Sequence, residues 1–156
     1  MYDTEFFDIL DVVDDTVIPK NAFYIGGDII PPILQSFTST TPDGDYTTGQ
    51  NINITATYSE NLAVGSTMTV VLDTGASVVL STISTTTLSG TYTIQAGEVS
   101  SDLTVSSISS EAVEDAAGNT RNNSSVPASN IADSSELTVN LNSGKPTGLL
   151  LALTKP

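Results

Sequence analysis

Histidine, cysteine and tryptophan are absent from this 156-residue chain, and only four lysine and arginine residues stand against 18 aspartate and glutamate residues. Without histidine and cysteine the chain has no serine triad with a histidine base, no cysteine nucleophile, no zinc site of the usual kind and no disulfide. The net charge of −14 also disfavours nucleic acids and anionic membranes, which are bound through clustered cations. We therefore expect no enzyme, no catalytic residues, and neither a nucleic acid nor a membrane as partner.

Long apolar runs and targeting signals are lacking as well. The longest apolar run, LLLAL at residues 149–153, is far too short to span a bilayer. Residues 1–15 have neither a basic beginning nor an uninterrupted apolar core, so they do not match a secretory signal. If Met1 is the natural start, we expect a protein that is made in a cytoplasm and kept there or released by lysis.

Serine and threonine are abundant instead, and strong helix formers are scarce through the middle of the chain. Residues 52–58, INITATY, alternate apolar and polar side chains, which predicts a half-buried strand. Comparable segments follow at 68–75, 76–83, 90–97, 101–108 and 136–142. Their spacing favours an all-β fold, a β-sandwich of about seven strands, with a barrel as the weaker alternative.

Two segments flank this predicted domain. The first, residues 1–30, carries seven acidic residues, yet Tyr2, Phe6, Ile9 or Leu10, and Val13 fall at the spacing of one apolar helix face. A solvating tail lacks aromatic residues, so we expect this segment to dock onto its own domain or onto a partner. We divide the chain into a docking arm and linker (1–30), a sandwich (31–142) and a C-terminal extension (143–156). The expected partner-binding residues are Phe6, Phe7, Leu10, Val13, Leu149, Leu150 and Leu151.

Five short motifs occur in a defined order along the predicted domain. A PDGDYTTG turn precedes the strand at 52–58 and SENL closes it; then come VVLDTGASVVLSTI, QAGEVSSDL and EDAAGNT. In this order they resemble a bacterial immunoglobulin-like (Big-type) repeat of large surface adhesins, over about residues 31–141. The resemblance implies an immunoglobulin-like β-sandwich. Adhesin repeats come in tandem, whereas this chain has one copy, an acidic aromatic arm before it and an apolar extension after it.

The DAAGN stretch has two interpretations. As a turn, it needs Asp115 to accept hydrogen bonds from nearby backbone amides, Gly118 to adopt a positive φ angle and Asn119 to cap the turn. As a metal loop, it is implied by the resemblance, because adhesin repeats often bind calcium at their junctions. The implied ligands are Glu60, Asp115, Asn119 and, from the linker, Asp28. Calcium is the one cofactor that we consider.

Two further features are less specific. Asp43 and Asp45 in PDGDY form a weaker calcium candidate, and neither candidate matches the EF-hand pattern, whose last glutamate is missing. Arg121, beside the polar run RNNSS, is interpreted as a residue of a solvated loop.

Three functions remain. The first is a non-enzymatic structural protein of a virion, a decoration or accessory protein of a bacteriophage capsid or tail, because adhesin-like domains are common on such particles. Its partner would be the major capsid or tail protein, bound in many copies or as a homo-oligomer, and its exposed face could bind a host-surface glycan. The second is a module of a calcium-dependent bacterial surface adhesin, located at the cell surface. The third is a self-assembling extracellular filament subunit, in which the arm or LLLAL adds a strand to a neighbouring copy.

Overall fold

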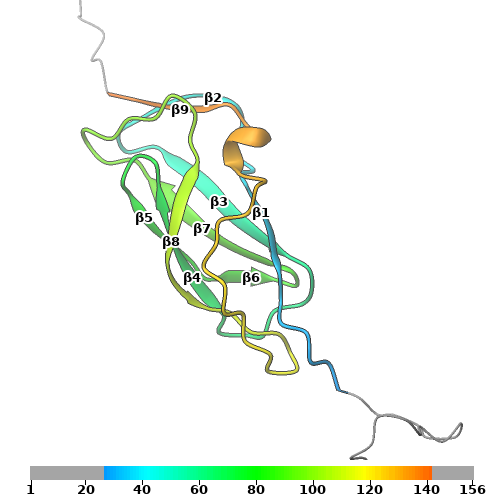
Figure 1. Ribbon diagram of the computed structural model, residues 1–156. Coiled ribbons are helices and arrows are strands. Elements are labelled where there is room, and N and C mark those ends of the chain that lie inside the picture. The colour runs from blue at the N-terminus through cyan, green and yellow to red at the C-terminus, as the bar shows by residue number, and fades with distance from the viewer. Residues whose placement is uncertain (1–26, 142–156) are drawn as a thin grey trace, which may run out of the picture.

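The computed structural model describes residues 27–141 of the protein. The described residues form nine strands and one short 3-10 helix (Figure 1). The strands are β1 (Leu34–Thr38), β2 (Gly44–Thr47), β3 (Asn51–Tyr58), β4 (Thr67–Leu72), β5 (Ser77–Leu80), β6 (Thr82–Ser84), β7 (Thr87–Thr93), β8 (Val105–Ala112) and β9 (Leu137–Asn140). The 3-10 helix is η1 (Ile131–Asp133). Within residues 27–141, no helix has the length and apolar character that crossing a membrane requires.

The expected partner-binding side chains of both flanking segments cannot be placed. Phe6, Phe7, Leu10, Val13, Leu149, Leu150 and Leu151 all lie outside the described residues. Their role therefore stays a prediction.

The strands form two main antiparallel sheets and one small parallel pair. One sheet has the order β1-β3-β7-β6, the other has the order β5-β4-β8, and β2 pairs in parallel with β9. The two main sheets overlie one another, with the 3-10 helix near the β2–β9 pair (Figure 1). The fold is therefore all-β, as the sequence predicts, and it has the layers of a β-sandwich.

The core lies between the two sheets because apolar side chains alternate along the strands. In β3 the buried side chains are those of Ile52, Ile54, Ala56 and Tyr58, which is the alternation that predicted this strand. Across the core, the buried side chains of the facing sheet come mainly from β4 and β5, and Ile131 of η1 is fully buried as well. Burying each large apolar side chain contributes about 1.5–3 kcal/mol, so this core is the main source of stability.

The chain passes from one sheet to the other between β5 and β6. Ser81 N donates a backbone hydrogen bond of 3.1 Å to Ser89 O in β7. Gly90 in β7 leaves room for this crossing, because a Cβ at that position would collide with the backbone oxygen of Val79 and approach Leu80 Cδ2 to 2.9 Å. A glycine is thus required where β7 passes against the backbone of β5.

Strand bounds differ from the prediction where the pattern is not local. The PDGDYTTG motif, expected to be only a turn, contains β2, which pairs in register with β9 from Gly44–Leu137 to Thr47–Asn140. A parallel pairing between segments more than 90 residues apart leaves no local periodicity that could predict it. Similarly, β8 runs to Ala112, four residues beyond the predicted end, because its exposed serines hide the alternation.

The described chain begins and ends at opposite ends of the sandwich. The linker before β1 leaves at the lower end in Figure 1, and β9 points to the upper end, away from the linker. The loop between β8 and β9 runs back along the sandwich from the lower end to η1. We call the lower end, where the linker enters, the linker end.

Candidate metal centre

The loop that follows β8 is a tight turn built around Asp115. Asp115 Oδ1 accepts hydrogen bonds from the backbone amides of Ala117, at 2.8 Å, and Asn119, at 2.9 Å. Gly118 has a φ of +89°, and Asn119 Nδ2 donates to Asp115 Oδ2 at 2.7 Å. The three features predicted for this turn are confirmed, and together they fix the carboxylate of Asp115 in a buried position, 2% exposed.

The loop after β3 brings Glu60 to the same place. Leu62 forms an isolated antiparallel bridge with Asp115, and Ala63 N donates to Glu114 O at 2.8 Å. The Ser66 hydroxyl secures this contact, since its oxygen lies 3.2 Å from both the backbone nitrogen and the backbone oxygen of Glu114. These bonds hold the loop that carries Glu60 against the DAAGN turn.

The linker supplies the third carboxylate. Asn119 Nδ2 donates to Asp28 O at 3.0 Å, so the cap of the turn also binds the linker backbone. Farther along, Ile33 and Ser59 exchange two bonds, Ile33 N to Ser59 Oγ at 3.0 Å and Ser59 N to Ile33 O at 2.9 Å. The linker is therefore attached to both the turn and the end of β3 before β1 begins.

Asp28, Glu60 and Asp115 together form what we call the linker-end cluster. One carboxylate oxygen of each lies within 4.8 Å of the others. Arg121 is the only lysine or arginine among residues 27–141, and its guanidinium binds Glu111, so the described residues bring no free cation to the cluster. The three negative charges repel one another at this separation.

Within the cluster, the pKa values of Glu60 and Asp115 shift in opposite directions. Desolvation and the neighbouring charges of Asp28 and Asp115 raise the pKa of Glu60 above its ordinary value. Burial alone would raise the pKa of Asp115, but the hydrogen bonds from Asn119 and Ala117 outweigh it and lower the pKa. Asp115 is thus the fixed anion of the cluster, whereas the charged form of Glu60 is disfavoured.

The donor set of the cluster fits calcium. Calcium binds oxygen ligands at about 2.3–2.6 Å, so two oxygens on one ion lie up to about 5 Å apart, and the cluster meets this limit. Asp28, Glu60 and Asp115 are the residues that could hold the ion. The amide nitrogen of Asn119 donates to Asp28 O and Asp115 Oδ2, so the residue positions the linker and the turn, and its role as a ligand stays a prediction. That calcium binds here stays a prediction.

The prediction for Arg121 is wrong. Arg121 is not in a solvated loop; the residue is 7% exposed, and its guanidinium binds the carboxylate of Glu111 in β8. Burial raises the pKa of Glu111, although the hydrogen bond and charge of Arg121 act in the opposite direction. The same pair lies beside Tyr58, whose pKa is raised by burial and by the charge of Glu111. The polar run after Arg121 misled the interpretation, because nothing in it indicates that β8 supplies a partner.

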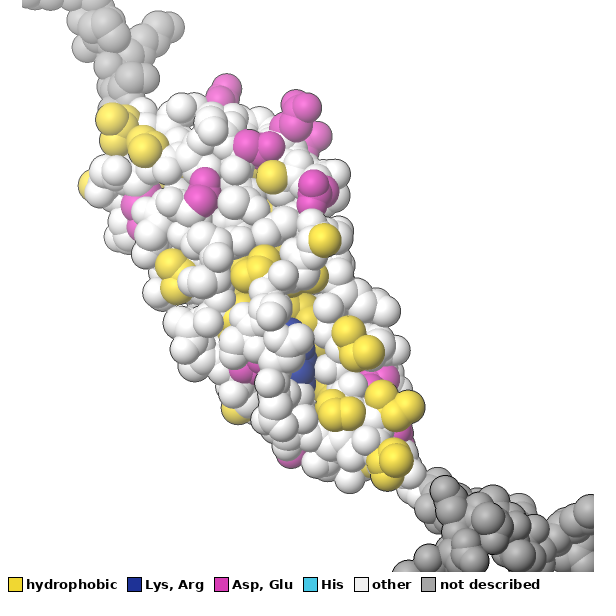
Figure 2. Space-filling view, in the orientation of Figure 1, with side chains coloured by type: hydrophobic (Ala, Val, Ile, Leu, Met, Phe, Trp, Pro, Cys, Tyr) yellow, Lys and Arg dark blue, Asp and Glu magenta, His cyan; other side chains and the backbone are white. Residues whose placement is uncertain are grey.

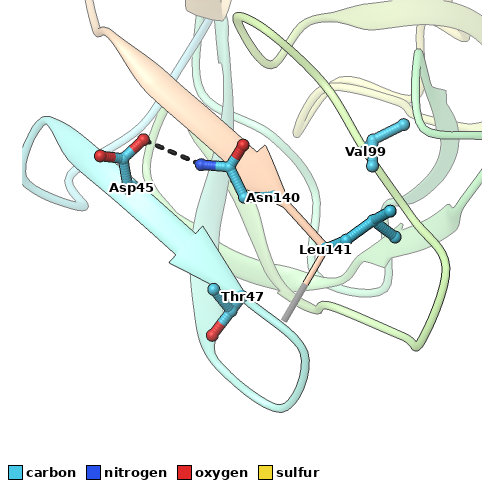
Figure 3. A pocket seen from close by; sticks show the side chains of 5 residues that line it. All are labelled: Asp45, Thr47, Val99, Asn140 and Leu141. Atoms are coloured by element: carbon cyan, nitrogen blue, oxygen red, sulfur yellow. Dashed lines mark hydrogen bonds between the residues drawn. The ribbon is translucent and has the colours of Figure 1, made fainter. Parts of the chain in front are cut away.

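The weaker calcium candidate lies at the opposite end and has a structural role. Asp43 Oδ1 accepts a hydrogen bond from Glu136 N at 2.9 Å. Asp45 Oδ1 accepts one from Asn140 Nδ2 at 2.9 Å, the bond drawn in Figure 3. Both carboxylates thus hold β2 against β9. In Figure 3 the Leu141 side chain projects beside Val99, away from Asp45. Across residues 27–141, the linker-end cluster is the one group of three acidic side chains with the spacing of a metal site.

Two residues of the site were not expected from the sequence. Ser59 and Ser66 bind the linker and the DAAGN turn through their hydroxyl groups. In a chain so rich in serine, neither position carries a signal that distinguishes it from the others.

Comparisons with known proteins give no relative. No protein-family model, curated protein or solved structure matches this chain.

Proposed function

We propose that this chain is a non-enzymatic structural protein that displays an immunoglobulin-like β-sandwich on a larger assembly, the capsid or tail of a virus particle. The strand order supports the immunoglobulin-like topology: β1, β3, β7 and β6 correspond to the A-B-E-D sheet, and β5, β4 and β8 to the C′-C-F strands. In this topology we assign the short β9 to the last strand, an assignment supported by the antiparallel bridge between Val139 and Ser100, just before β8.

The observation that carries the proposal is the attachment of the linker to the sandwich. Asp28 on the linker meets Glu60 and Asp115, and the Ile33–Ser59 bonds add a second attachment. A linker fixed in this way transmits orientation from an anchor to the domain, which suits a display role. We propose that a calcium ion in the linker-end cluster completes this attachment, with Asp28, Glu60 and Asp115 as ligands.

A second function, a repeat module of a bacterial surface adhesin, is favoured by one observation. Residues 27 and 141 lie at opposite ends of the sandwich (Figure 1), the arrangement that joins domains in series. A calcium ion beside the linker would stiffen such a series. The two functions share the sandwich and the metal and differ in where the protein is found.

Localisation distinguishes these functions. Antibodies raised against the full chain would be used for immunogold labelling of purified virus particles and of cells from the same culture. Regular labelling of capsids or tails is the expected result. Labelling of the cell surface, with bare particles, would contradict the virion proposal and favour the adhesin module.

A further inference from the structure

A groove with an apolar wall on the linker side and a mostly polar wall on the other side separates the linker from the loop that follows the DAAGN turn. Its volume is about 440 Å³; residues 30–34 form one wall and residues of the segment 120–127 form the other. Ile30 and Ile33 are each about 60% exposed, and Val126 and Pro127 face them from the opposite wall. In Figure 2 apolar side chains gather beside the only basic side chain in view. Apolar side chains that are exposed together along one wall of a groove form a candidate binding surface.

The groove exists because two segments begin to pair and then separate. Phe37 N donates to Ser129 O at 3.1 Å, and Ser36 forms a parallel bridge with Ser129. Between residues 30–34 and 120–127, the described backbone has no hydrogen bonds across the groove. Since β1 is an edge strand, its outer side near Leu34 is open along the groove. This open edge could pair with an extended segment lying beside β1 where the 120–127 loop has moved away from it.

The length of the groove selects a short segment. Its linker wall has five residues, from Ile30 to Leu34, which in extended form span about 17 Å. The apolar run LLLAL, residues 149–153, also has five residues. An extended pentapeptide of leucine and alanine would therefore cover the wall from end to end.

Charge selects the C-terminal extension over the N-terminal arm. Residues 27–141 contain 12 acidic residues and one arginine, and the linker-end cluster lies next to the groove through Asp28. Residues 142–156 contain Lys145 and Lys155 and no acidic residue, so positive charges flank LLLAL on both sides. The arm, residues 1–26, has six acidic residues and one lysine and would be repelled. The linker wall of the groove therefore fits LLLAL in polarity, and the surrounding negative charge fits the lysines of the extension.

The direction of the chain selects a second copy as the source. Strand β9 points away from the linker end (Figure 1), so the extension must turn back along the domain to reach the groove of its own chain. When copies stack end to end, the groove of the next copy lies directly ahead. We propose that residues 149–153 of one copy occupy the groove of the next, between Ile30–Leu34 and the 120–127 segment. This contact concerns assembly between copies and goes beyond the proposed virion location.

Cross-linking tests this contact, because the chain has no cysteine and every introduced thiol is unique. Chains carrying Ile33→Cys are mixed with chains carrying Leu151→Cys in chelator, and disulfide-linked heterodimers are followed with time under mild oxidation. The matched control is Val79→Cys in β5, since Val79 is 57% exposed and Ile33 60%. We expect the Ile33–Leu151 pair to form heterodimers at least about tenfold faster than the Val79–Leu151 pair, because bound segments have a high effective concentration.

Two further experiments make the result decisive. The double variant with Ile33→Cys and Leu151→Cys in one chain should form oligomers and not closed monomers. Replacing Lys145 and Lys155 by glutamine should slow the cross-linking severalfold, as should high salt, whereas Lys20→Gln in the arm should not. Equal rates for the Ile33 and Val79 pairs, or closed monomers in the double variant, would overturn the proposal; the latter result assigns the groove to the extension of the same chain.

Discussion

The segment from Glu111 to Arg121 contributes to two groups of charged side chains, one a neutralised ion pair and the other a cluster of like charges. At its ends, Glu111 and Arg121 form a buried pair whose side chains are 5% and 6% exposed, and each charge neutralises the other. In its middle, Asp115 meets Asp28 and Glu60 with no cation from the described residues. The first group is complete within the chain. In the second, no cation of residues 27–141 balances the charge.

The comparison teaches what each group contributes. A buried pair adds little net stability over an apolar pair, but removing one partner is costly because the other charge remains buried. The cluster at the linker end behaves differently, because Glu60 already has a raised pKa and takes up a proton more readily than an isolated glutamate. The pair is therefore a structural element, and the cluster is a candidate for binding.

Breaking the pair should have the largest effect. Arg121→Met leaves the buried carboxylate of Glu111 in β8 without its partner, so the free energy of unfolding should fall by about 3–5 kcal/mol, measured by urea denaturation. The control is the double variant Arg121→Met with Glu111→Leu, which removes both charges. Recovery of most of the loss is expected in the double variant, and a loss below about 1 kcal/mol in the single one would contradict a buried ion pair.

Removing the fixed anion of the cluster should have the next largest effect. Asp115→Asn keeps an acceptor for the amides of Ala117 and Asn119 but removes the charge, so the thermal midpoint should no longer respond to calcium. Asp43→Asn is the control, since Asp43 holds β2 against β9 at the opposite end. A calcium response that survives in Asp115→Asn would exclude this residue as a ligand.

A smaller effect is expected from Glu60→Gln in chelator. Because the folded state raises the pKa of Glu60, its charge destabilises the fold above that pKa, and the cost disappears as the pH falls through it. The variant should therefore melt above the wild-type protein at pH 7, by about 1–3 °C, and the difference should shrink on acidification. Asp115, with a lowered pKa, works in the opposite direction, since its contribution is lost as the pH falls through that pKa. A variant that melts below the wild-type protein at neutral pH would refute the repulsion.

The same ionisation predicts how calcium binding depends on pH. A proton on Glu60 competes with the metal, so calcium affinity should decrease as the pH falls toward the raised pKa of Glu60. Titration calorimetry at several pH values measures this dependence. In Glu60→Gln the affinity should be lower at neutral pH and should vary less with pH. A calcium affinity that stays constant as the pH falls to the ordinary pKa of a glutamate would exclude Glu60 as a calcium ligand.

Local patterns in the sequence predicted much of the fold and of the linker-end cluster. The alternation in residues 52–58 indicated β3, and the composition of DAAGN indicated the turn around Asp115. That Asp28 and Glu60 would join Asp115 followed from the resemblance to adhesin repeats and agrees with the geometry. Short-range periodicity and turn chemistry are properties of a few neighbouring residues, so a single sequence contains them.

Features that depend on distant partners could not be predicted. The pairing of β2 with β9 joins Asp43 to Glu136, and the partner of Arg121 comes from the exposed serine-rich strand β8. The groove beside Ile33 exists because a parallel pairing at Ser129 stops after one bridge. In each case the feature depends on which distant segment of the chain packs alongside, and no local sequence pattern specifies that partner.

The most direct test of the account is the thermal unfolding midpoint of the full chain in millimolar calcium and in chelator, with magnesium as the control. If Asp28, Glu60 and Asp115 hold the ion and attach the linker, the midpoint in calcium should rise by about 5 °C or more over that in chelator, and magnesium should do much less. A midpoint that calcium leaves unchanged would contradict the metal centre and remove the calcium attachment of the linker from the proposed function.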